Sequence, residues 1–303
     1  MTRHLLSLND LTGEEIVRLL DRAVELKGMQ RRGEIYEPMR GGALAMIFEK
    51  SSTRTRVSFE VAAIQFGGNA IFIAPGDSQL GRGEPVADTA RVLSSMTRAI
   101  VMRTHSHERV VELAKHSRVP VINGLSDRFH PCQLLADLLT WVEHRGSVTG
   151  RTAAWVGDGN NMCHSWANAS KLLGFNLNIA TPAGYEPDPD IVTDPAGRIT
   201  LGNDPAAAVA GADVVVTDTW ASMGQEEEKQ QRVKDFAGFT VDAALMARAG
   251  ADALFMHCLP AYRGYEVASE VIDGPQSVVF DQAENRLHAQ KALLEFLLRT
   301  VGP

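Results

Sequence analysis

The sequence predicts an α/β protein of two domains, each a parallel β-sheet flanked by helices, with the active site in the interdomain cleft. Short apolar runs alternate with amphipathic helical segments, and this alternation occurs in two separate blocks. Strands that alternate with helices are typical of parallel sheets covered on both faces. Unusual polar residues follow several predicted strands, and such sheets bind ligands beyond the carboxyl ends of their strands.

A break at Arg145, Gly146 and Ser147 separates the two blocks. We therefore expect a first domain over residues 1–145 and a second over 146–283. A C-terminal helix over 284–303 is expected to pack back on the first domain. A chain of 303 residues is long enough for two domains of ordinary size.

The composition is that of a soluble globular protein, with 45% hydrophobic and 22% charged residues. The net charge of −7 argues against general nucleic-acid binding. No apolar run approaches the ~20 residues that a membrane-spanning helix needs, and the N-terminus lacks a signal-peptide core. Three widely spaced cysteines, Cys132, Cys163 and Cys258, indicate thiols in a reducing compartment. These features predict a cytoplasmic protein.

The secondary structure of both blocks follows from periodicity and capping residues. A capping box that starts at Thr12 begins a helix that ends near Gly28. Strands are predicted over 43–48, 69–73, 99–102, 120–122, 152–156, 177–180, 213–217, 254–256 and 277–280. Further helices are predicted to begin directly after the strand 43–48 and at residues 88, 131 and 284. Another is predicted to end at residue 173, and one more to cover residues 225–234. Residues 182–205 are expected to be irregular around one short helix.

The segment Ser52-Thr53-Arg54-Thr55-Arg56 lies where the strand 43–48 turns into a helix. A helix start offers unpaired backbone N–H groups and the positive end of the helix dipole. Hydroxyl groups and guanidinium groups add directional donors, and arginine matches the geometry of phosphate oxygens. One helix cap does not require so many donors in a row. The segment therefore predicts an anion site, most simply one for phosphate.

Glycines after the strand 152–156 also suggest a dinucleotide-binding loop, but the pattern is incomplete. Gly157-Asp158-Gly159 lacks the third glycine, and no acidic residue ends the strand 177–180. A Walker loop is also absent, because no Gly-Lys-Ser/Thr follows these glycines. The sequence therefore does not favour nucleotide binding.

Four short motifs occur in order, each at the end of a predicted strand: Ser52-Thr53-Arg54-Thr55-Arg56, His130-Pro131-Cys132-Gln133, Asp218-Thr219-Trp220-Ala221-Ser222-Met223-Gly224 and His257-Cys258-Leu259-Pro260. Together they resemble the aspartate/ornithine carbamoyltransferase superfamily, on its ornithine branch, over essentially the whole chain. The resemblance implies transfer of a carbamoyl group from carbamoyl phosphate to the δ-amine of L-ornithine, which gives L-citrulline and phosphate in arginine metabolism. It implies no metal and no organic cofactor.

The resemblance also implies a role for particular residues. Carbamoyl phosphate binding is carried over to Ser52, Thr53, Arg54, Thr55, Gln79, Arg103, His130, Gln133, Cys258, Leu259 and Arg286. Ornithine binding is carried over to Asn161, Asp218, Ser222 and Met223, and catalysis to Arg54, Arg103, His130, Asp218 and Cys258. In the family the glutamine that matches Gln79 reaches the phosphate of a neighbouring subunit, which implies a homotrimer, or a higher assembly of trimers, with shared sites.

The chemistry of the reaction agrees with these residue types. An amine attacks a carbonyl, so negative charge develops on the carbonyl oxygen, and Arg103, His130 and Thr55 supply donors for that oxygen. The attacking amine must be neutral, and Asp218 and Cys258 are suited to accept hydrogen bonds from it. The departing phosphate is a chemically reasonable acceptor for the proton.

The sequence leaves other functions to be weighed. A carbamoyltransferase for aspartate, putrescine or an acylated ornithine shares the same chemistry, and a non-catalytic carbamoyl phosphate-binding regulator would share the first site alone. Ser222-Met223-Gly224 favours a cationic amino acid over aspartate. One departure from the family pattern is Tyr262, where relatives usually have histidine; it lies outside the proposed ligand contacts.

Overall fold

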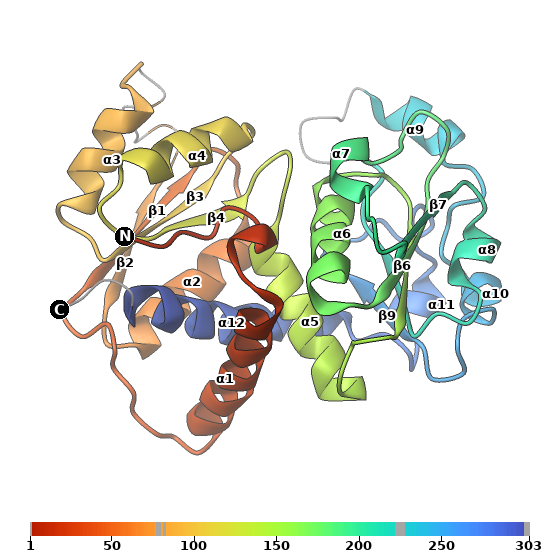
Figure 1. Ribbon diagram of the computed structural model, residues 1–303, viewed down its shortest axis with the longest axis horizontal. Coiled ribbons are helices and arrows are strands. Elements are labelled where there is room, and N and C mark those ends of the chain that lie inside the picture. The colour runs from red at the N-terminus through yellow and green to blue at the C-terminus, as the bar shows by residue number, and fades with distance from the viewer. Residues whose placement is uncertain (1, 75, 77–79, 81–82, 222–227, 300–303) are drawn as a thin grey trace. The chain divides into compact units, whose positions relative to one another are not determined.

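The chain divides into two compact units, Met1–Leu139 with Glu284–Pro303, and Thr140–Ala283. The structure, a computed structural model, describes residues 2–74, 76, 80, 83–221 and 228–299 (Figure 1). Each unit contains one sheet whose paired strands all run parallel. The predicted fold class, two parallel sheets flanked by helices, is therefore confirmed.

The first unit is built on a four-stranded sheet in the order β2-β1-β3-β4. Its strands are β1 (Ala43–Phe48), β2 (Asn69–Ile73), β3 (Ala99–Arg103) and β4 (Val121–Leu125). Its helices are η1 (Leu8–Asp10), α1 (Gly13–Arg31), α2 (Thr53–Gln65), α3 (Val86–Ser94) and α4 (His107–His116), with parts of α5 (Pro131–Arg145) and α12 (Val279–Arg299). Figure 1 shows α3 and α4 on one side of this sheet and α2 on the other.

The central strands of the first unit are buried because each is a run of apolar side chains. Every residue of β3 is buried, and only Ala43 of β1 is partly exposed. A core on one side of the sheet includes Ile47, Met102 and Val110. Buried parallel strands of this kind read as continuous hydrophobic runs, which is why the sequence predicted them well.

The last helix, α12, joins the first unit through polar contacts with α1. Arg22 donates to Glu295 at 2.8 Å, and Lys27 donates to the side chain of Asn285 at 2.8 Å in a buried contact. Tyr36 also donates its hydroxyl to Glu295 at 2.7 Å. Residues near the two ends of the chain therefore share one compact unit.

The second unit is built on a five-stranded sheet in the order β7-β6-β5-β8-β9. Its strands are β5 (Thr152–Val156), β6 (Asn176–Ala180), β7 (Ile199–Gly202), β8 (Val214–Thr217) and β9 (Leu254–His257). Its helices are α6 (Asn161–Leu173), α7 (Pro189–Val192), α8 (Pro205–Val209), α9 (Lys229–Asp235), α10 (Ala243–Met246) and α11 (Ser269–Ile272). Figure 1 shows α6 and α7 on one side of the sheet and α8, α10 and α11 on the other.

Two expectations about local structure are wrong. The segment 277–280 is not a strand, because Ser277 makes only an isolated bridge to Phe255 and α12 begins at Val279. The segment 182–205 contains not only the short helix α7 but also the edge strand β7, three of whose residues are exposed. A short apolar run fits either a strand or a helix start, and an exposed edge strand lacks the apolar pattern.

Among the residues that the structure describes, no helix has the length and apolar character required to cross a membrane.

Candidate active site

The hydroxyl and arginine segment forms the N-terminus of α2. Ser52 is the N-cap residue, and its side chain accepts a hydrogen bond from the backbone N–H of Thr55 at 3.3 Å. Thr53 and Arg54 open the first turn, and Thr55 is buried. The first turn of a helix carries partial positive charge on its backbone N–H groups, so the segment is suited to an anion.

Arg103 lies at the same edge of the sheet as the start of α2. It is the last residue of β3 and pairs in register with Phe48, the last residue of β1. The side chain is almost fully buried, at 6% exposure. Parallel sheets of this kind bind ligands beyond the carboxyl ends of their strands. The position of the Arg103 guanidinium group at this edge therefore favours a role in binding an anionic or strongly polar ligand.

Arg286 connects the last helix to both motifs of the first unit. Its guanidinium group donates to the side-chain oxygen of Gln133 at 2.6 Å and to the hydroxyl of Thr55 at 3.0 Å. The amide nitrogen of Gln133 in turn donates to Asp137 at 2.8 Å, which fixes the orientation of the amide. All these contacts are buried. Side chains that are 231 residues apart in the sequence therefore form one hydrogen-bonded group.

His130 lies within the same cluster of positive charges. Burial holds the pKa of its imidazole well below the usual value, and the positive charges of Arg286, Arg103 and Arg54 lower it further. The ring is therefore neutral at pH 7. A neutral imidazole has one donor nitrogen and one acceptor nitrogen, so it can donate to a carbonyl oxygen without adding another positive charge.

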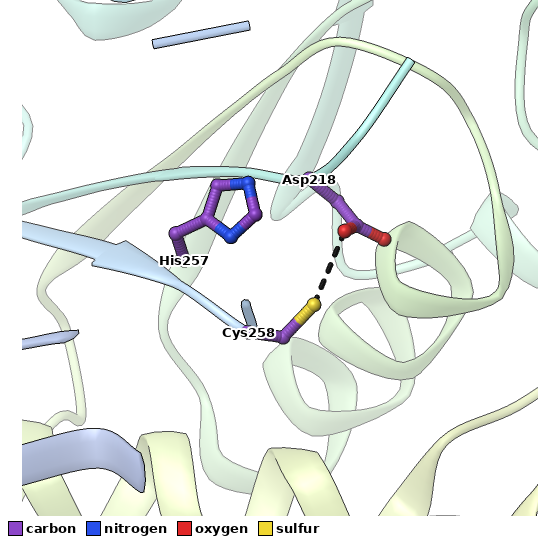
Figure 2. Close-up of side chains that lie close together, drawn as sticks. All are labelled: Asp218, His257 and Cys258. Atoms are coloured by element: carbon purple, nitrogen blue, oxygen red, sulfur yellow. Dashed lines mark hydrogen bonds between the residues drawn. The ribbon is translucent and has the colours of Figure 1, made fainter. Parts of the chain in front are cut away.

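In the second unit, Asp218 and Cys258 follow neighbouring strands that end in register. Thr217 of β8 pairs with His257 of β9, so the next residue of each strand lies at the same edge of the sheet. The thiol of Cys258 donates to the carboxylate of Asp218 at 3.1 Å, and Figure 2 shows this contact. Asp218 also accepts the backbone N–H of Thr219 at 2.7 Å. The pair offers acceptors that suit a cationic or neutral amine.

His257 lies beside this pair, and its ring is held from both sides. Its Nδ1 accepts the backbone N–H of Leu259 at 2.8 Å, which places the ring proton on Nε2, 3.2 Å from the carboxylate of Glu266. Asp218, His257 and Cys258 each offer one donor atom for a metal, and these atoms lie within 4.8 Å of one another (Figure 2). Because both histidine nitrogens already have protein partners, we assign no metal to this group. The expectation of a cofactor-free enzyme stays a prediction.

The asparagine that contacts Asp218 is Asn160, one residue before the asparagine that the resemblance matched. The amide nitrogen of Asn160 donates to Asp218 at 2.9 Å. Its oxygen accepts the backbone N–H of Met162 at 2.9 Å, so the same side chain caps α6. Asn161 is the first residue of that helix. Sequence reasoning missed Asn160, although an asparagine before a helix is a usual capping signal.

The glycines of this loop have a structural explanation that involves no nucleotide. Gly157 has a φ of 134°, a conformation that favours glycine. A Cβ atom on Gly159 would lie 2.2 Å from the backbone nitrogen of Pro187, so only glycine fits there. Backbone conformation therefore accounts for Gly157, and close packing against the backbone of residues 185–187 accounts for Gly159.

The structure brings together most of the residues that the sequence singled out, one group in each unit. The first unit joins Arg54, Thr55, Arg103, His130, Gln133 and Arg286, with Ser52 and Thr53 at the same helix start. The second unit joins Asp218 and Cys258, with Leu259 next to the thiol and Asn161 next to the capping asparagine. Gln79, Ser222 and Met223 lie outside the described residues. The ligand roles of all these residues stay predictions.

Comparison with known proteins identifies the family of both halves. Residues 3–143 match the carbamoyl-P binding domain of aspartate/ornithine carbamoyltransferase, and residues 149–297 match the Asp/Orn binding domain of the same family. An ornithine carbamoyltransferase of Nitrosococcus oceani is 60% identical over 295 residues, which are 97% of each chain. One of Methylococcus capsulatus is 60% identical and covers 98% of each chain.

A solved structure agrees with this result. The ornithine carbamoyltransferase from Pyrococcus furiosus is similar with a TM-score of 0.93 and 51% sequence identity. The match covers 97% of this chain and 96% of that one. The two domain matches and the near-full-length relatives together show that the chain belongs to the aspartate/ornithine carbamoyltransferase family.

Proposed function

We propose that this protein is an ornithine carbamoyltransferase, which transfers the carbamoyl group of carbamoyl phosphate to the δ-amine of L-ornithine and releases L-citrulline and phosphate. One observation carries the proposal: a cluster of arginines, two of them buried, around Thr55 and His130 in one unit, and the Asp218–Cys258 pair in the other. The first group suits a phosphorylated substrate and the second suits an amine. Relatives that bear this enzyme's name match nearly the whole chain.

Carbamoyl phosphate fits the cluster in the first unit. The α2 N-terminus, from Ser52 to Thr55, offers N–H, hydroxyl and guanidinium donors to the phosphate oxygens. Arg103 and neutral His130 donate to the carbonyl oxygen, where negative charge develops when the amine attacks. Removal of one such donor commonly costs on the order of 10²–10³ in rate. The positive charge of Arg286 favours the dianionic leaving group.

Ornithine fits the acidic group in the second unit. The carboxylate of Asp218 attracts a positively charged amino group, and Cys258 and Leu259 follow the neighbouring strand. The attacking amine must be neutral, and hydrogen bonds to Asp218 and Cys258 orient its lone pair. The departing phosphate takes the proton. Contact between amine and carbonyl supplies up to ~7–11 kcal/mol of the barrier reduction. The location of the site between the two domains, expected from the sequence, stays a prediction.

The choice among acceptors is the sharpest test of this function. The family name includes aspartate, but a carboxylate at position 218 would repel the acidic side chain of aspartate. The purified protein is incubated with carbamoyl phosphate and, separately, L-ornithine, L-aspartate, putrescine or N-acetyl-L-ornithine, and phosphate release is measured. We expect ornithine to give the highest kcat/KM and citrulline as product. Faster turnover of another acceptor, or carbamoyl phosphate binding with no turnover, rejects the proposal.

A substitution separates the two halves of the reaction. Asp218→Asn removes the negative charge that attracts ornithine but leaves the cluster in the first unit unchanged. We expect a loss of at least about 100-fold in kcat/KM for ornithine, with unchanged affinity for carbamoyl phosphate by calorimetry. An exposed control in the same unit, Asp273→Asn, should retain both properties. Equal loss of carbamoyl phosphate affinity in Asp218→Asn counts against the division of roles.

The protein is proposed to act as a homotrimer in the cytoplasm, and an exposed apolar face of the first unit supports the assembly. Val57 and Ile64 lie on one face of α2 and are 51% and 64% exposed. Ile71, on the edge strand β2, is 50% exposed. Edge strands and exposed apolar faces are usually covered in the functional state. Free thiols at all three cysteines suit a reducing compartment.

Light scattering tests the assembly. We expect the wild-type mass to be three times that of one chain, or a multiple of this, and Ile64→Glu to reduce it. The matched control is Val17→Glu on α1, where the native side chain is 49% exposed. A monomeric wild type, or a trimer that Ile64→Glu leaves intact, contradicts the proposed surface.

A further inference from the structure

Arg232, on α9, holds three segments of the second unit together. Its side chain is only 9% exposed. One guanidinium nitrogen donates both to the carboxylate of Asp158 at 2.9 Å and to the backbone carbonyl of Trp220 at 2.8 Å. Another nitrogen donates to Glu228 at 3.2 Å, and the group lies 4.9 Å from the ring centre of Tyr185. Arginine suits this position because its planar group donates in several fixed directions.

Two of these segments carry the acceptor side of the proposed active site. Asp158 lies in the loop between β5 and α6, two residues before Asn160. Trp220 lies two residues after Asp218 in the segment that follows β8. Asn160 donates to Asp218, so the same two segments are joined at a second point. Arg232 contacts Asp158 and Trp220 and not the site residues Asn160 and Asp218. It therefore acts on the site by holding the two loops that carry these residues.

The carboxylate of Asp158, which is 13% exposed, does not stabilise the fold by its charge. Burial raises the pKa of Asp158 to about 6, and the nearby Arg232 offsets only part of this effect. A raised carboxyl pKa means that the folded state binds the proton more tightly than the unfolded state does. Protonation therefore stabilises the fold as the pH falls through about 6, and the ionised form at pH 7 costs stability. A charge kept at such a cost indicates a functional constraint.

We propose that Arg232 and Asp158 are positioning residues for the ornithine site: their ion pair fixes the loop after β5 against the segment after β8, and so sets the position of Asp218 relative to Asn160 and Asn161. The inference rests on the proposed function. Neither residue is proposed to contact the substrate or the reacting atoms, so neither is a catalytic residue. Breaking the pair should weaken ornithine binding and leave the carbamoyl phosphate cluster in the first unit untouched.

The pair also makes ornithine binding sensitive to pH. The groups that face the Asp158 carboxyl are Arg232 and Glu228 at α9, Asp218 after β8, Cys163 on α6, and Tyr185 with its partner Asp235. Arg232 is the cation among them, so protonation of Asp158 removes the ion pair. Below a pH of about 6 the two loops lose this connection, and the ornithine KM rises.

The test compares Asp158→Asn and Arg232→Gln with the control Asp273→Asn, which breaks the exposed ion pair of Arg263 and Asp273 in the same unit. We expect both variants of the pair to raise the ornithine KM by about tenfold, the loss of one charged hydrogen bond, with kcat within about threefold of wild type. The affinity of both variants for carbamoyl phosphate should not fall, and neither should the Tm of Asp158→Asn at pH 7. The control should match wild type in every measurement.

A pH series gives a readout that a purely structural role would not change. Titration of ornithine itself affects every variant equally, so it cancels in the ratio of KM for Asp158→Asn to KM for wild type. We expect this ratio to fall toward one between pH 8 and pH 5, because wild type loses its ion pair in that range. A constant ratio, an unchanged KM in Asp158→Asn, or a lowered Tm with unchanged KM overturns the inference. A wild type inactive with ornithine would instead reject the proposed function.

Discussion

The imidazole of His257 and the carboxylate of Glu266 face each other at 3.2 Å, and both side chains are excluded from solvent. The same carboxylate oxygen accepts the backbone N–H of Tyr262 at 2.5 Å. On its other side, the ring accepts the backbone N–H of Leu259, whose φ of 56° is unusual for a leucine. Glu266 therefore fixes a ring that in turn holds the backbone beside Cys258 in a left-handed conformation, which costs about 1–2 kcal/mol.

Glu266→Ala is predicted to destabilise the second unit. Removal of one partner leaves the Nε2–H of His257 and the N–H of Tyr262 without their acceptor in a buried environment. Each buried donor that is left unsatisfied costs about 1–3 kcal/mol, which urea denaturation measures. The exposed Glu270→Ala, four residues away, should change the unfolding free energy by less than about 0.5 kcal/mol. Equal stability of the two variants would refute the structural role of the pair.

Cys258 is predicted to react with iodoacetamide faster than the other two cysteines. Cys258 is partly exposed, whereas Cys132 and Cys163 are buried. Burial raises the pKa of Cys132 to about 12 and the pKa of Cys163 well above its usual value, so few of their thiols ionise at pH 8. Peptide mapping should locate one fast modification per chain, which Cys258→Ser abolishes and saturating ornithine slows. If iodoacetamide modified Cys132 before Cys258, the prediction that Cys258 is the most reactive thiol would be wrong.

The ring of His130 is predicted to stay neutral between pH 6 and pH 8. Burial and three neighbouring arginines hold its pKa well below the usual value, so heteronuclear NMR should show constant ring shifts over this range. The fold binds the ring proton less tightly than the unfolded chain does, so this histidine lowers stability as the pH falls below about 6.5. His130→Gln should identify the resonance and lose less stability between pH 7 and pH 5. A ring that titrates near pH 6.5 contradicts the assignment.

Arg286→Gln is predicted to weaken carbamoyl phosphate binding by about 10- to 100-fold. The substitution removes charged, buried hydrogen bonds to Gln133 and Thr55, and each such bond is worth roughly 1.5–3 kcal/mol. Isothermal titration calorimetry measures the affinity. Arg299→Gln on the same helix is the control, because the side chain of Arg299 is 70% exposed. Wild-type affinity in Arg286→Gln would exclude it from the site.

The sequence predicted the parts of the fold that depend on local pattern. The strands 43–48 and 152–156 were predicted with their observed ends, because each is a buried apolar run bounded by polar or turn residues. The exposed edge strand β7 was missed, and the start of α12 was read as a strand. The first error arises because an exposed edge strand lacks the apolar pattern, and the second because a short buried apolar run fits either a strand or a helix start.

For the candidate site, the sequence identified the residues of the four motifs but not the residues that support them. Asn160, Glu266 and Arg232 act through partners 9 to 74 positions away. One sequence gives no information about such pairs, because they depend on which loops the fold brings together. A capping signal was present for Asn160; for Glu266 and Arg232 the printed sequence offers none.

The split composition of the first unit has a consequence for synthesis. A ribosome completes the contiguous segment 140–283 before it reaches Arg286, whereas the other unit needs residues from both sides of that insertion. The nascent chain therefore carries Thr55 and Gln133 for more than 150 codons before their shared guanidinium partner emerges. Premature termination anywhere upstream of codon 286 yields a product whose first unit lacks the guanidinium partner of Thr55 and Gln133.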